Sequence, residues 1–248
     1  MSNTIDWGKI HFSSWSPETN LTGSSGAFAN TQSIELDGID DFVNVTNSNI
    51  LDGLQKATWS FWFKKSGTGA KYLSGHWNNG NQFLFLFIPS SNRIDGYVNG
   101  VRAFNNNSTT ISVDTWYNAV FVLDSTLATI GDRLKLFIDG TQIVNTGGAT
   151  LPQNATLNTD TGDILIGKDT TGFNWDGYID EVSFWSDAKT ISDIWDGSGI
   201  PTDLTGKSNL LAWWRMGDGD TAPTITDNAG SADGTMNNFS TFSTDVPT

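Results

Sequence analysis

The chain has 248 residues, with 27 Asp and Glu against 13 Lys and Arg and a formal net charge of −14. Such an acidic balance argues against binding to the phosphate backbone of nucleic acids and against docking on anionic membranes. The absence of cysteine excludes disulfides and thiol chemistry. No signal peptide is visible and no apolar run approaches the length of a membrane-spanning helix.

The chain begins with an expected N-terminal arm, residues 1–32, whose second half is rich in Ser, Gly, Asn and Thr. From residue 33 the pattern changes to short apolar segments separated by turns. Residues 33–248 are therefore expected to form one β-sandwich. Its predicted core strands include Thr58–Lys64, Phe83–Ile88 and Trp116–Leu123.

Two dipeptides, Asn99-Gly100 and Asp139-Gly140, predict tight β-hairpins. Both pairs accept the positive φ values of a two-residue turn whose twist matches the flanking strands. The strands expected on either side are Ile94–Val98 with Val101–Phe104, and Leu134–Ile138 with Thr141–Val144.

The region after residue 185 contains the one helix that the sequence predicts, near residues 188–196. Ile191, Ile194 and Trp195 fall at helical spacing there, and Gly197 is placed to end the helix. Leu210–Met216 is then expected to add a C-terminal strand to the same core, with Trp213 and Trp214 on opposite faces.

The strand around which the chain is organised is Asp176–Trp185. Strict alternation puts Asp180 and Glu181 on opposite faces, so that one carboxylate points into the core. A buried carboxylate is costly unless hydrogen-bond donors, a cation or a local break in the pleat relieves it.

Two segments, IELDGIDDFVNV at residues 34–45 and GYIDEVSFW at residues 177–185, together resemble the paired strands of laminin-G-like, concanavalin A-like lectin domains. Weaker matches at Thr58–Lys64, Thr115–Val120 and Leu136–Gly140 extend the resemblance over roughly residues 33–197. It implies an all-β fold, a two-sheet antiparallel jelly-roll sandwich with the two segments as neighbours. The opening MSNTIDWGKI resembles the start of some bacteriophage structural proteins.

The loop that holds Asp37, Asp40 and Asp41 is the predicted calcium site, with Asp180 on the opposite strand as a further ligand. Ca²⁺ takes six to eight oxygen ligands, which carboxylates supply well. The resemblance also implies a structural calcium near such a loop. The alternative is that Asp37-Gly38 simply makes a tight turn.

Two tryptophans, Trp77 and Trp175, lie in polar loops beside Asn78 and Asn174. A flat ring can stack on a sugar while neighbouring amides bond its hydroxyls, so these four residues are the predicted ligand-binding set. The alternative is that the loop tryptophans fold back onto the sandwich.

Catalytic patterns are absent from the sequence. The paired carboxylates of the glycosidases that share this fold, Glu-x-Asp-x-x-Glu or its shorter form, do not occur, and the chain has only three Glu and two His. The sequence therefore predicts a non-catalytic carbohydrate-binding or adhesion module, without enzyme activity. It would be displayed on a virus particle or cell surface, or be extracellular, as a homo-oligomer or bound to the particle. A structural virion component, such as a head decoration or fibre protein, is the alternative, and a polysaccharide-active enzyme is the third.

Overall fold

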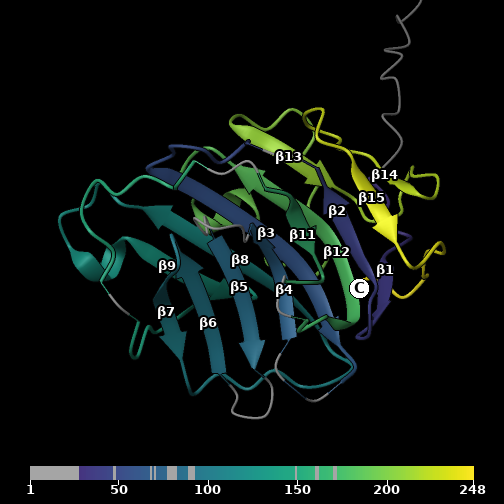
Figure 1. Cartoon of the computed structure of the whole chain (residues 1–248), viewed down its shortest axis with the longest axis horizontal. Helices are drawn as coiled ribbons and strands as arrows, with labels where there is room; N and C mark the ends of the chain where they lie inside the picture. The colour runs from purple at the N-terminus through teal and green to yellow at the C-terminus, as the bar shows by residue number, and fades with distance from the viewer. Residues whose placement is uncertain are drawn as a thin grey trace, which may run out of the picture.

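The computed structural model describes residues 28–46, 49–67, 69, 71–75, 93–148, 150–159, 162–169 and 172–248, and the backbone of residues 76 and 83–88. Two antiparallel sheets lie face to face in it (Figure 1). The described residues contain no α-helix, only short 3-10 turns at Ile130–Asp132 and Ile191–Asp193. None of the described helical segments is long and apolar enough to span a membrane.

One sheet has seven strands in the order β1-β12-β3-β8-β9-β10, with β13 also paired to β12. The strands are β1 (Ile34–Asp37), β3 (Lys56–Lys65), β8 (Trp116–Asp124), β9 (Leu134–Ile138), β10 (Thr141–Ile143), β12 (Asp176–Trp185) and β13 (Leu210–Trp214). β12 is paired with β3 along one edge. Its other edge is shared by β1, which covers Asp176–Ile179, and β13, which covers Val182–Trp185.

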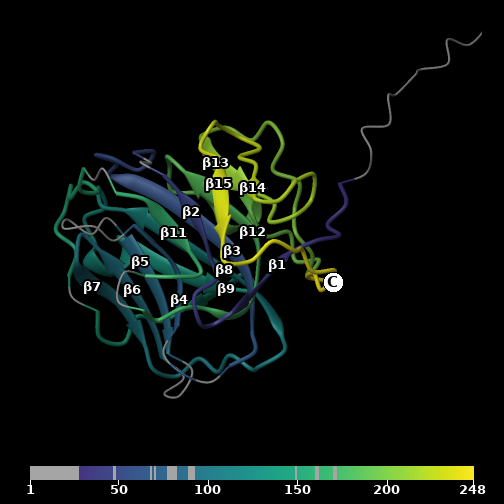
Figure 2. The ribbon, with the colours of Figure 1, turned by 45° about the vertical axis from the view of Figure 1, so that its right-hand side comes forward.

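The other sheet has eight strands in the order β14-β15-β2-β11-β4-β5-β6-β7. The strands are β2 (Phe42–Val45), β4 (Lys71–His76), β5 (Phe83–Ile88), β6 (Arg93–Val98), β7 (Val101–Asn106), β11 (Ile164–Ile166), β14 (Thr224–Ile225) and β15 (Gly234–Asn237). The C-terminal segment, yellow-green to yellow in Figures 1 and 2, lies along one side of the sandwich and contributes strands to both sheets.

The main core lies between the sheets, where alternate residues of each strand meet. On β3 these are Ala57, Trp59, Phe61 and Phe63, all buried. A second, smaller cluster covers the outer face of the seven-stranded sheet. It comprises Val120, Val122, Trp185, Ile194, Leu204 and Trp213. Apolar residues on both faces therefore explain why β3, β8 and β12 form the middle of this sheet.

Several sequence predictions are confirmed. The predicted pairing of residues 34–45 with 177–185 holds for the first half, because β1 is the antiparallel neighbour of β12, whereas Phe42–Val45 forms β2 of the other sheet. Asn99-Gly100 and Asp139-Gly140 form the β6–β7 and β9–β10 turns, with φ between +47° and +73°. β13 joins the same sandwich, and Trp214 lies in the main core whereas Trp213 lies in the outer cluster. The strands β14 and β15, which follow β13, were not predicted.

The helix predicted near residues 188–196 is wrong. Only Ile191–Asp193 forms a turn, of the 3-10 type. The preceding backbone is held by Thr58 of β3, whose hydroxyl donates to the Asp187 carbonyl and accepts from the Lys189 amide. These bonds fix the backbone of residues 187–189 against β3, and only the single 3-10 turn follows them.

The alternation predicted for β12 is also wrong, because the strand contains a β-bulge. Its pairing with β3 shifts between Asp180 and Ser183, and Glu181 has a φ of +46°. Ile179 and Val182, three residues apart, consequently both point into the main core. The bulge lies at the junction between β1 and β13. A local break in the pleat, one of the three ways to relieve a buried carboxylate, is therefore present at Asp180 and Glu181.

Candidate functional site

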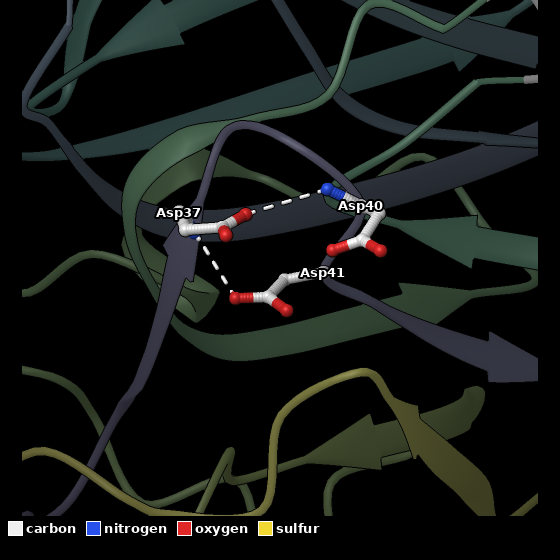
Figure 3. Close-up of side chains that lie close together, drawn as sticks. All are labelled: Asp37, Asp40 and Asp41. Carbon is white, nitrogen blue, oxygen red and sulfur yellow. Dashed lines mark hydrogen bonds between the residues drawn. The ribbon is translucent and has the colours of Figure 1, made fainter.

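The predicted calcium loop connects β1 of one sheet to β2 of the other, and its three Asp side chains lie together (Figure 3). One ligand atom from each of Asp37, Asp40 and Asp41 can be chosen so that all lie within 4.8 Å of one another. Asp37 and Asp40 are exposed, whereas Asp41 is buried. Burial raises the pKa of Asp41, and the neighbouring Asp37 and Asp40 carboxylates raise it further. The donor set consists of hard oxygens, which fits a calcium ion.

The tight turn is present as well. Oδ1 of Asp37 accepts from the amides of Ile39 and Asp40 at 2.8 and 3.3 Å. Gly38 has a φ of +74°, and a Cβ there would lie 2.7 Å from Cβ of Asp176 and 2.8 Å from Nζ of Lys71. Turn geometry thus positions the carboxylates, and the two sequence interpretations of this loop are compatible.

Asp180 does not join this group, which corrects the predicted ligand set. The register of β1 against β12 places Asp176 opposite Asp37. Asp180 lies four residues further along β12, about 13 Å away at the usual rise of a strand. The sequence pairs the two strands but does not fix their register.

Asp180 and Glu181 instead form a buried acidic pair at the bulge. Nδ2 of Asn30 donates to Asp180 at 2.8 Å, and the Glu181 amide donates to Asp180 at 2.9 Å. Glu181 accepts from Nε1 of Trp213 at 2.5 Å and from Nε of Arg215 at 3.1 Å. Burial raises the pKa of Asp180 well above its usual value, with the Glu181 charge adding to the shift. Burial also raises the pKa of Glu181, to about 7, against the opposing effect of Arg215.

Trp175 and Asn174 are not exposed to a ligand, so this half of the predicted binding set is wrong. Trp175 is fully buried in the main core, where it packs edge-on against Phe63 with ring centroids 5.6 Å apart. Asn174 is buried and donates its side-chain amide to the carbonyl of Ile39. The loop tryptophan has folded back because the apolar core takes up its large ring.

Trp77 and Asn78, the other half of the set, lie outside the described residues, so they remain a prediction. The described residue that sequence reasoning missed is Phe173, which is 46% exposed. It lies beside Asn174, next to the calcium loop, and its ring is 5.7 Å from that of Tyr72. The sequence does contain a second aromatic residue beside Trp175, in Gly172-Phe173-Asn174-Trp175. It does not show which of the two rings is buried and which is exposed.

The same end of the sandwich therefore combines an acidic loop with exposed apolar side chains. Ile39, at the tip of the loop, is 73% exposed. Nζ of Lys71 is 3.5 Å from the Gly38 carbonyl, and that of Lys168 lies 4.1 Å from the centroid of the Phe42 ring. This arrangement can bind a ligand that offers both an apolar face and hydroxyl groups.

Comparison with known families matches residues 37–195 to the concanavalin A-like lectin/glucanase superfamily, in its laminin G group. The chain belongs to this superfamily. The match begins at the first Asp of the calcium loop and ends beyond β12, so it includes the whole segment that carries Phe173. Comparison with curated protein sequences gives no match.

Solved structures show the same fold at low sequence identity. A putative carbohydrate-binding protein from Bacteroides ovatus is 15% identical, with a TM-score of 0.64 over 89% of this chain and 62% of that one. A heptameric pentraxin from Limulus polyphemus is 13% identical, with a TM-score of 0.57 over 87% and 95%. The extracellular region of zebrafish Gpr126 is 16% identical, with a TM-score of 0.57 over 87% and 26%.

Proposed function

We propose that the protein is a non-catalytic carbohydrate-binding module whose ligand binds at the end of the sandwich formed by the calcium loop and Phe173. The observation that carries the proposal is the exposed Phe173 ring, whose neighbour Asn174 donates to the Ile39 carbonyl of the loop that holds the exposed Asp37 and Asp40. An aromatic ring can stack on a sugar face while the carboxylates accept hydrogen bonds from its hydroxyls. The similarity to a putative carbohydrate-binding protein supports this function.

Calcium is the proposed cofactor, held by the carboxylates of Asp37, Asp40 and Asp41. Three carboxylates so close together repel one another, and a divalent cation would offset that repulsion. The remaining ligands would be water molecules or ligand hydroxyls. The ion would fix the loop beside Phe173.

We also propose that the module acts in several copies, as an oligomer or on the surface of a particle or cell. A single exposed aromatic ring contributes modest affinity to a sugar, whereas linked copies multiply weak contacts. The acidic surface suits a ligand other than nucleic acid, and its affinity should change little with salt.

The test changes Phe173 to Ala and measures binding of tetravalent protein to a glycan array. Loss of one aromatic contact, worth roughly 1 kcal/mol, should weaken binding of the monomer about 5-fold. Binding of the tetramer should weaken by a larger factor, because the contact is lost in every copy. Val144→Ala is the matched control, since Val144 is 70% exposed and directly follows β10, whereas Phe173 lies between β11 and β12. The proposal fails if the unmodified tetramer binds no glycan, or if Phe173→Ala binds as well as Val144→Ala.

A further inference from the structure

A cavity lies on the outer side of the seven-stranded sheet, and the residues that line it fall outside the superfamily match at residues 37–195. Its volume is about 350 Å³, near the lower end of the range for small-molecule sites. The residues that line it include Phe28, Ala29, Asp203, Trp213, Arg215 and Asn228. It is therefore built by segments that flank the shared domain on both sides, and it does not correspond to a site formed within that domain.

Arg215 is held rigidly at this cavity. Its Nε donates to Glu181 at 3.1 Å, and its Nη2 donates to the Ala29 carbonyl at 2.5 Å and to Asp218 at 3.3 Å. The centre of its guanidinium lies 4.5 Å from the Phe28 ring centroid and 5.5 Å from that of Trp213. The third nitrogen, Nη1, makes no hydrogen bond to a described residue, and its N–H groups are of the kind that donate to a ligand oxygen.

Acceptors also line the cavity. Asp203 is exposed, and its Oδ1 accepts the Thr205 amide at 2.9 Å. Asn228 is also exposed and donates its Nδ2 to the carbonyls of Trp213 and Thr226. This leaves the Asn228 Oδ1 without a hydrogen-bond donor among the described residues. The cavity thus presents a donor and acceptors around the partly buried ring of Phe28.

The charges around the cavity select against ionic ligands. A cation would meet Arg215, which already occupies the faces of both aromatic rings. An anion would meet the Asp203 carboxylate, with Glu181 and Asp218 behind Arg215. A neutral ligand with several hydroxyls meets neither repulsion, because each hydroxyl both donates and accepts.

We propose that this cavity binds one neutral sugar residue, at a second site separate from the calcium loop. The inference rests on the proposed carbohydrate-binding function and adds to it the place and the charge class of a second ligand. Two sites on one chain would let each module bind two sugar residues or two chains, which raises avidity without new contacts.

The test fills the cavity by changing Ala29 to Phe. The substitution keeps the backbone carbonyl of residue 29, which accepts a hydrogen bond from Arg215. The probes are methyl glycosides of neutral hexoses, compared with glucuronic acid and glucosamine, and binding is followed by ¹H–¹⁵N NMR of the whole chain. Neutral glycosides should shift the Asn228 side-chain amide and the amides of residues 28–29 and 203–205. Ala29→Phe should weaken this binding at least 10-fold, whereas Ala128→Phe, at an exposed alanine on another loop, should leave it unchanged.

Asn228→Ala is a second variant in case Ala29→Phe does not fold, and it should weaken binding several-fold. The inference is overturned if the charged sugars bind there as well as the neutral ones, or if either folded variant binds like the unmodified chain. Shifts confined to Phe173 and the calcium loop would overturn the second site while supporting the proposed function. An absence of shifts with every sugar, and of binding on the array, would overturn both.

Discussion

Two adjacent carboxyl groups, those of Asp180 and Glu181, are almost fully buried. Removing such groups from water costs more free energy than burying apolar side chains at the same positions. Each has specific donors: Asn30 and a backbone amide for Asp180, Trp213 and Arg215 for Glu181. Glu181 also has a positive φ, a conformation that non-glycine residues adopt at a cost. The donors and the bulge together hold the residues before β1 against the end of β13.

This pair predicts that the protein is more stable in weak acid than in weak base. Both folded-state pKa values are raised, so the stabilising contribution is complete below the unfolded pKa, near 4, and is lost as pH rises through about 7 for Glu181. The free energy of unfolding from urea titrations should be about 2 kcal/mol greater at pH 5.5 than at pH 8.

Glu181→Gln tests this assignment because glutamine does not ionise. The variant should show a smaller difference between pH 5.5 and pH 8 than the unmodified chain. Asp193 serves as a control residue for this pH range. Hydrogen bonds from Thr190 lower the pKa of its carboxyl group, so its contribution to the free energy of unfolding changes only in stronger acid than pH 5.5. A difference that Glu181→Gln leaves unaltered would contradict the role of the pair.

At the scale of elements, β12 is the strand on which the seven-stranded sheet depends. It pairs with β3 along one edge and with β1 and β13 in turn along the other. Gly177, near its start, lies between Leu36 of β1 and Lys65 of β3. Its φ is +135°, and a Cβ there would lie 2.1 Å from the backbone oxygen of Lys64. Close contact between the strands therefore requires glycine at this position.

Gly177→Ala should be strongly destabilising, by about 4 kcal/mol or more, because the obstacle is backbone and cannot rotate away. Gly53→Ala is the matched control. Gly53 has a φ of +69°, but a Cβ at this position would have no atom within 4 Å, so only the left-handed backbone cost of about 1–2 kcal/mol applies. Urea unfolding of the two variants measures the difference, and equal losses would show that crowding at Gly177 is unimportant.

At the scale of the whole molecule, the calcium loop connects the two sheets, since β1 and β2 belong to different ones. The segments on either side of the family match then add to both sheets. In the arm, Asn30 donates to Asp180 and Thr31 donates to Asp218. Ser33 and Ser243 are joined by two hydrogen bonds, each between the amide of one and the carbonyl of the other. Stability of the loop is therefore expected to affect the whole sandwich.

Calcium should raise the melting temperature. A ligand at 100 times its dissociation constant stabilises the folded state by about 2.7 kcal/mol, or roughly 5–10 °C for a chain of this size. Excess chelator should remove this increment. Asp40→Ala should abolish the response because it removes one of the three carboxylates. The Asp40 side chain makes no hydrogen bond to the described residues, so the substitution should not disturb the turn itself. Asp132→Ala, which removes only a surface ion pair with Lys135, should respond like the unmodified chain. A melting curve unaffected by calcium and chelator would leave the loop as a turn without a metal.

The sequence by itself determined the strands and turns whose causes are local. Asn-Gly and Asp-Gly at residues 99–100 and 139–140 tolerate positive φ, and alternating apolar residues define β3 and β9. The family resemblance added the pairing of β1 with β12. The three neighbouring Asp of the calcium loop were likewise visible, because they lie within five consecutive residues, 37–41, which bring them together without the rest of the fold.

Only the tertiary structure decided what depends on distant partners. The register of β1 against β12 separates Asp180 from the calcium loop, and the bulge that breaks alternation lies where β1 gives way to β13. The burial of Trp175 and the exposure of Phe173 follow from which ring the core around Phe63 accommodates. Thr58 of β3 likewise fixes the backbone of residues 187–189, ahead of the single turn at Ile191–Asp193. Each outcome is set by contacts between segments far apart in the chain. The energies of such contacts cannot be read from a local sequence pattern.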